Sequence, residues 1–207
     1  MAKIQPIRTQ SQTEAEPVRL SDRAADNLKF IRETMERATH FTAVPGYGGV
    51  LMGVTAVVAA YIATQQPTPR GMLMVWLTEA FLAFAIGVLA MWQKSKLANS
   101  SLLSAPARKF AFGFAPAIIC GVVITLGLWR YEQFALMAPV WMLLYGAAIV
   151  TGGAFSVRVV PVMGWLFMAI GAIAFAAPPD FGNYLMGASF GLLHIVFGAV
   201  IARKYGG

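Results

Sequence analysis

Six long apolar segments follow residue 48, and they limit the folds open to this chain more than any other feature. They cover residues 49–64, 72–93, 109–129, 134–151, 161–177 and 182–202. A helix that crosses about 30 Å of hydrocarbon needs roughly 17–25 residues. Only 12% of the 207 residues are charged, whereas soluble domains average about 25%. We therefore predict an all-α, polytopic transmembrane helix bundle of about six spans over residues 49–207.

Prolines fall where these helices need to end. Pro67 and Pro69 follow the first segment, Pro106 precedes the third, and Pro161 opens the fifth. Pro116 instead lies inside the third segment. Proline lacks an N–H and clashes with the preceding turn, so we expect Pro116 to kink that helix.

The residues before the bundle are polar and divide into three parts. Residues 1–19 predict a disordered tail. Residues 20–41 predict an amphipathic helix at the cytosolic or interfacial side, with an apolar face that includes Leu28 and Ile31. Its charges balance, so docking on protein and docking on lipid both stay open. Residues 42–48 predict a joint, because Pro45 ends a helix and Gly46 and Gly48 allow a turn.

The positions of the basic residues predict the orientation. The chain has 16 Lys and Arg. With the N-terminus inside the cell, all of them except Arg70 and Arg130 lie on the cytosolic side. Cytosolic loops of membrane proteins carry such an excess. We therefore expect a multi-pass protein with both termini in the cytosol.

Two residues are candidates for intramembrane polar groups. Glu79 is the only carboxylate inside an apolar segment, and His194 lies near the middle of the sixth. Ionisable groups are costly in a membrane, so each is expected to face other helices or a water-filled cavity. Each can handle protons or ions, or it can be a hydrogen-bonded packing residue. The sequence does not say whether the two side chains meet.

Small residues at four-residue spacing predict close contacts between helices. The candidate helix-packing residues are Gly49, Gly53, Gly187, Gly191 and Gly198.

The sequence carries no recognisable catalytic motif, and we predict that the protein is not an enzyme. With one cysteine and two histidines, we expect neither a metal site nor a cofactor. The net charge of +7 is a topology signal here, so nucleic acid is not an expected partner. The basic loop 94–109 is the only feature that would suit an enzyme acting on lipid.

Two stretches carry a resemblance to known proteins. Residues 146–161 (GAAIVTGGAFSVRVVP) and 191–207 (GLLHIVFGAVIARKYGG) resemble a family of small, uncharacterised six-helix integral membrane proteins of bacteria. The resemblance covers most of the bundle but not the first 20 residues. It implies a bacterial inner (cytoplasmic) membrane and implies no activity.

The sequence is compatible with two functions. The first is a non-catalytic accessory or regulatory membrane subunit, whose partners are the lipid bilayer and either a second copy or a larger membrane complex. The second is a small transporter or channel that uses Glu79 and His194. A polar cavity that reaches Glu79 would favour transport, and a dry bundle would favour the accessory role.

Overall fold

The computed structural model of the chain describes residues 27–31, 44–97 and 104–206. Residues 27–31 are helical and belong to a unit separate from the bundle. The remainder of the predicted 20–41 helix and the predicted 1–19 tail lie outside the described residues. The other described residues form helices without a strand, which confirms the predicted all-α bundle.

Six helical spans are long and apolar enough to cross a membrane. The first three are α2 (Gly46–Thr64), α3 (Pro69–Leu97) and α4 (Ala105–Arg130). The fourth joins the short η1 (Phe134–Leu136) to α5 (Met137–Gly153), and the fifth is α6 (Val159–Ala176). The sixth runs through η2 (Pro179–Phe181), α7 (Gly182–Met186), the π-helical η3 (Gly187–Leu193) and α8 (His194–Tyr205). These spans place the chain among multi-pass membrane proteins.

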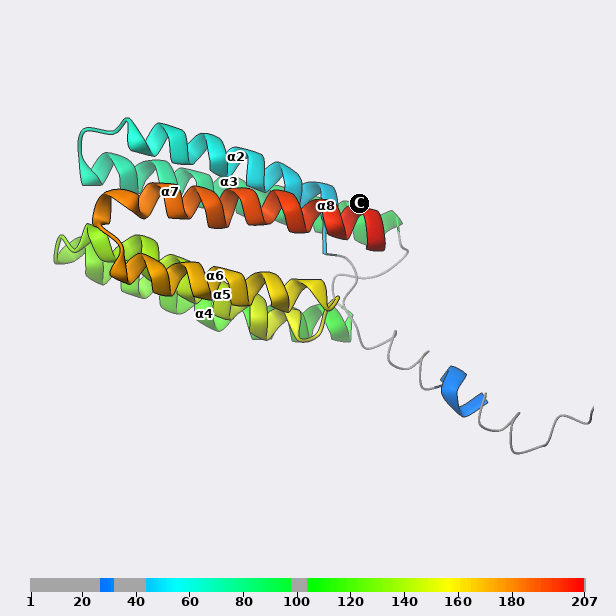
Figure 1. Cartoon of the computed structure of the whole chain (residues 1–207). Helices are drawn as coiled ribbons and strands as arrows, with labels where there is room; N and C mark the ends of the chain where they lie inside the picture. The colour runs from blue at the N-terminus through cyan, green and yellow to red at the C-terminus, as the bar shows by residue number, and fades with distance from the viewer. Residues whose placement is uncertain (1–26, 32–43, 98–103, 207) are drawn as a thin grey trace, which may run out of the picture. The chain divides into compact units, whose positions relative to one another are not determined.

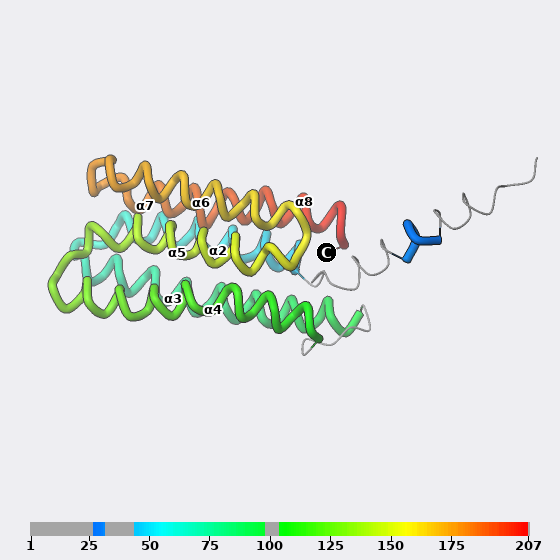
Figure 2. The backbone as a smooth tube through the Cα atoms, turned by 90° about the horizontal axis from the view of Figure 1, so that it is seen from below, coloured from blue at the N-terminus to red at the C-terminus, as the bar shows by residue number. Residues whose placement is uncertain are grey.

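The spans form two layers of three helices. One layer holds α3, α2 and the α7–α8 span, and the other holds α4, α5 and α6 (Figure 1). In each layer the middle helix packs on both neighbours: α2 on α3 and α8, and α5 on α4 and α6. Between the layers, α6 packs on α7 and α8, and α5 packs on α7. Figure 2 shows the same bundle from below, where the two layers overlap in projection. The buried core between the layers includes Met142 and Phe167.

The beginning of the bundle differs from the predicted joint in one respect. We expected Gly46 and Gly48 to allow a turn, but α2 already begins at Gly46, directly after Pro45. A Cβ atom at Gly46 would lie 2.5 Å from the backbone of Ala202 in α8. This glycine therefore serves the close approach of two helices.

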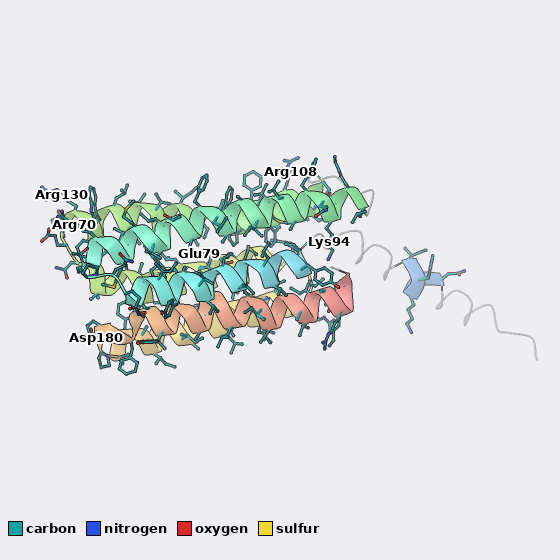
Figure 3. The ribbon with its side chains drawn as sticks, turned by 90° about the horizontal axis from the view of Figure 1, so that it is seen from above. Arg70, Glu79, Lys94, Arg108, Arg130 and Asp180 are labelled. Carbon is teal, nitrogen blue, oxygen red and sulfur yellow. The ribbon has the colours of Figure 1, made fainter. Side chains whose placement is uncertain are left out.

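Charged residues separate towards the two ends of the bundle. We call one end the basic end, and it carries Lys94, Lys96, Arg108, Lys109, Arg158, Arg203 and Lys204. The opposite end carries Arg70, Arg130, Glu132 and Asp180. Figure 3 shows Lys94 and Arg108 at the first end and Arg70, Arg130 and Asp180 at the second.

Lys94 ties three helices together at the basic end. Its Nζ donates to the carbonyl of Val44, just before α2, at 2.9 Å, and to the carbonyl of Gly206, just after α8, at 2.5 Å. The ammonium group thus holds the start of α2 and the end of α8 against α3.

Candidate functional site

Glu79 is a buried carboxyl group about a third of the way along α3 (Figure 3), with 7% of its surface exposed. The hydroxyl of Thr55 in α2 donates to its Oε1 at 2.8 Å. The same hydroxyl lies 2.9 Å from the carbonyl of Met52 and 3.2 Å from that of Leu51. Glu79 therefore faces another helix, as expected for an ionisable group at this depth, and it links α3 to α2.

His194 is the first residue of α8 and is also 7% exposed. Its Nε2 lies 2.8 Å from the hydroxyl of Tyr145 in α5. This hydrogen bond connects the two layers of the bundle. Polar side chains that bond across helices are a recurring way of joining membrane helices.

The other ring nitrogen of His194, Nδ1, is buried and makes no hydrogen bond within the described residues. The direction of the Tyr145–His194 hydrogen bond depends on the tautomer of the imidazole, because a neutral ring has one donor and one acceptor nitrogen.

Aromatic rings surround this hydrogen bond. The ring centroids of Phe167 and Phe190 lie 5.0 Å from that of Tyr145, and the Phe167 centroid lies 5.5 Å from that of His194. Phe114 of α4 adds an edge-on contact to Tyr145 at 6.0 Å. These rings come from four spans, so the cluster joins both layers at one place.

A second buried network lies nearer the opposite end. The indole Nε1 of Trp76 donates to Oδ1 of Asn183 at 2.9 Å, and Nδ2 of Asn183 lies 3.1 Å from the sulfur of Met72. The Trp76 ring also packs on Phe190, with centroids 6.3 Å apart. This network links α3 to α7 and continues into the aromatic cluster.

The structure gives Glu79 and His194 separate partners. Glu79 bonds to the middle helix of one layer and His194 to the middle helix of the other. No hydrogen bond between them occurs in the described part of the chain. The sequence analysis did not identify Tyr145 and Asn183 as polar partners. The only sequence feature that could have indicated them is a polar side chain within an apolar run.

The predicted packing glycines lie between α2 and the sixth span. A Cβ at Gly49 would be 3.3 Å from Gly198, and one at Gly53 would be 2.6 Å from the carbonyl of Gly191. A Cβ at Gly187 would be 2.9 Å from Ala60. The helices thus approach backbone to backbone along this line. Pro116 lies inside α4, which continues as one helix through it.

A shallow groove of about 330 Å³ lies between α2 and the sixth span, away from the two buried polar groups. It is lined by Val57, Ala60, Tyr61, Thr64, Tyr184, Gly187, Ala188 and Leu192. Neither Glu79 nor His194 contributes to its wall.

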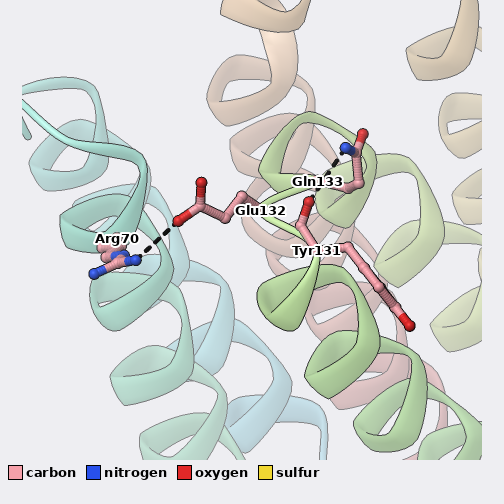
Figure 4. A network of polar contacts seen from close by, with 4 residues as sticks. All are labelled: Arg70, Tyr131, Glu132 and Gln133. Atoms are coloured by element: carbon pink, nitrogen blue, oxygen red, sulfur yellow. Dashed lines mark hydrogen bonds and ion pairs between the residues drawn. The ribbon is translucent and has the colours of Figure 1, made fainter.

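An ion pair at the opposite end of the bundle is exposed to solvent. Arg70 of α3 pairs with Glu132 in the loop after α4 at 3.0 Å, with both side chains about 70% exposed (Figure 4). Exposed ion pairs contribute about 0–1 kcal/mol. The cluster of three or more His, Cys, Asp or Glu that a metal site would need does not occur among the described residues.

No family model, no curated protein and no solved structure matches this chain. The resemblance of residues 146–161 and 191–207 to a bacterial family receives no support from these comparisons.

Proposed function

We propose that this protein is a non-catalytic accessory or regulatory subunit of a membrane complex, and that α4 is the helix through which it contacts the complex. The observation that carries the proposal is the exposure of α4. None of its 18-residue apolar window is buried, against 39% of the window in α2. Most of the helix perimeter is free to contact the helices of a partner or of a second copy.

The buried polar pairs support a structural role for the interior. Thr55–Glu79 and Tyr145–His194 each join an outer span to the middle helix of a layer. Hydrogen bonds of this kind fix the arrangement of membrane helices. An accessory subunit needs a rigid bundle of this type rather than a moving pathway.

The proposed location is a bacterial inner membrane, with the basic end in the cytosol. Seven Lys and Arg residues lie at that end of the described bundle and two at the other. Cytosolic ends of membrane helices carry the basic excess. The starts of α2, α4 and α6 then lie on the cytosolic side.

Extraction of the full-length protein from its membrane in native-lipid polymer particles tests the proposal. The accessory role requires a particle mass that exceeds one chain of 22.3 kDa plus the lipid of the particle. Ala115→Trp on the exposed side of α4 should shift the protein to the one-chain mass, because the bulkier ring blocks helix contact. Ile173→Trp on α6, where the side chain is 61% exposed, is the matched control and should leave the mass unchanged. A parent protein that runs as a single chain would overturn the proposal.

A small transporter or channel is the second candidate. Its support is the buried Nδ1 of His194, which lacks a partner among the described residues next to the π-helical η3. π-Helical turns are frequent at functional sites. Transport predicts a proton flux into proteoliposomes above that of empty liposomes, and loss of that flux in Glu79→Gln or His194→Phe.

A further inference from the structure

Within the described bundle, the basic end carries positive charge that no carboxylate neutralises. In residues 44–97 and 104–206 the only acidic residues are Glu79, Glu132 and Asp180. Glu79 lies about a third of the way along α3, and Glu132 and Asp180 lie at the opposite end of the bundle. The seven cations of the basic end therefore have no carboxylate partner in the described bundle.

Several of these cations are already engaged or lie in a less favourable position for binding an anion. Lys94 donates to two backbone carbonyls, and the Nζ of Lys96 lies 3.7 Å from the centre of the Trp92 ring. Arg203 and Lys204 lie in the last turn of α8, where the negative end of the helix dipole offsets their charge.

Arg108, Lys109 and Arg158 remain, and they lie on neighbouring elements. The Nζ of Lys109 in α4 lies 5.8 Å from the ring centre of Phe155, which is three residues before Arg158. The α4 helix is held against the end of α5, from which this connection leads to α6, because the Thr151 hydroxyl of α5 donates to the carbonyl of Gly113 in α4 at 2.7 Å.

The local backbone adds to the attraction for an anion. Both α4 and α6 begin at this place, with Ser104 and Arg158 as their N-cap residues. The N-terminal end of a helix carries a partial positive charge. Two such ends and three exposed cations therefore lie at the same end of the bundle.

The apolar side chains nearby favour a lipid over a soluble anion. Phe112 is 74% exposed and Phe155 is 39% exposed. Phe112 follows Arg108 by four residues in α4, which puts both on the same face of the helix, and Phe155 lies near Lys109. One molecule with a phosphate and acyl chains can therefore contact both kinds of side chain.

We propose that Arg108, Lys109 and Arg158 form a binding site for the phosphate group of an anionic phospholipid, whose acyl chains lie along Phe112 and Phe155. Basic residues between helices at the cytosolic side recognise anionic headgroups by this combination of charge and apolar contact. The site lies apart from the Glu79 and His194 pairs and does not depend on the proposed accessory role.

The test uses the purified full-length protein in a neutral detergent, titrated with dioleoyl phosphatidylglycerol and followed by native mass spectrometry. Arg108→Gln/Lys109→Gln/Arg158→Gln should weaken phosphatidylglycerol binding on the order of 100-fold, because each cation near an anionic surface contributes about fivefold. The exposed single variant Arg158→Gln should weaken it about fivefold, and it guards against a triple variant that fails to fold.

Three controls decide the outcome. Arg70→Gln/Arg130→Gln removes charge at the opposite end and should leave binding unchanged, and phosphatidylcholine should bind the parent and the triple variant alike. Inorganic phosphate at the same concentration should not compete with the lipid. Equal binding by the parent and the folded triple variant, equal loss in the opposite-end variant, or full competition by phosphate would each overturn the proposal.

Discussion

At the residue scale, the two buried polar pairs differ in what remains when one partner is removed. Thr55 would keep other hydrogen-bond acceptors, whereas His194 would keep no hydrogen-bond partner among the described residues. The Thr55 hydroxyl can donate to Glu79, but carbonyls of its own helix also lie within 3.2 Å. His194 has only the Tyr145 hydroxyl as a hydrogen-bond partner of ordinary geometry in the described chain. Loss of the bond should therefore be more costly at His194 than at Thr55.

Tyr145→Phe tests this difference. It removes the hydroxyl and leaves a buried imidazole nitrogen unpaired, which should lower the free energy of unfolding by about 1–2 kcal/mol. Glu79→Leu is the matched comparison, and it should cost less than about 0.5 kcal/mol because Thr55 keeps backbone acceptors. Reversible unfolding in mixed detergent micelles measures both changes.

A double variant tests whether the hydrogen bond itself stabilises this contact. In Tyr145→Phe/His194→Leu no polar atom of the pair is left unpaired, so part of the stability lost in Tyr145→Phe should return. Additive losses in the double variant would show that the hydrogen bond is not what stabilises this contact.

At the element scale, the contact of α2 with α8 depends on glycines that face backbone atoms. A Cβ at Gly198 would lie 2.6 Å from the amide nitrogen of Val50 and 2.8 Å from the carbonyl oxygen of Gly46. Backbone cannot rotate away as a flexible side chain can. A methyl group here must push the two helices apart.

Gly198→Ala should therefore destabilise the bundle by about 1–3 kcal/mol, the usual cost of overpacking. Gly127→Ala in α4 is the control, because a Cβ there meets nothing within 4 Å. It should be neutral or should stabilise by up to about 1 kcal/mol, since alanine favours helix over glycine. Thermal unfolding in one detergent compares them, and equal melting temperatures would contradict the close contact.

At the scale of the whole molecule, the separation of charge predicts the orientation. An even number of spans predicts that the start of the first span and the end of the last lie on one side of the membrane, and the basic residues there predict that this side is cytosolic. A fluorescent-protein fusion after Gly207 should fluoresce, and an alkaline phosphatase inserted within residues 65–70 should be active. Active phosphatase at Gly207 would contradict the model, because the enzyme works only after export.

The sequence by itself determined the class of fold and the number of spans. Both depend on local properties, because a stretch of about 20 apolar residues can satisfy its backbone in a membrane only as a helix. The predicted segment 134–151 and the observed span Phe134–Gly153 illustrate this. The burial of Glu79 and His194 was predictable for the same reason, since the cost of exposing them to lipid does not depend on the fold.

Only the tertiary structure decided which helices meet and therefore what each polar group contacts. Lipid is as apolar as the protein interior, so the side of a membrane helix that faces its neighbours leaves little trace in hydrophobicity. Tyr145 reaches His194 across 49 residues of chain, and Gly46 at the start of the first span meets Ala202 near the end of the last. These contacts follow from the packing of two three-helix layers, which no local pattern of residues specifies.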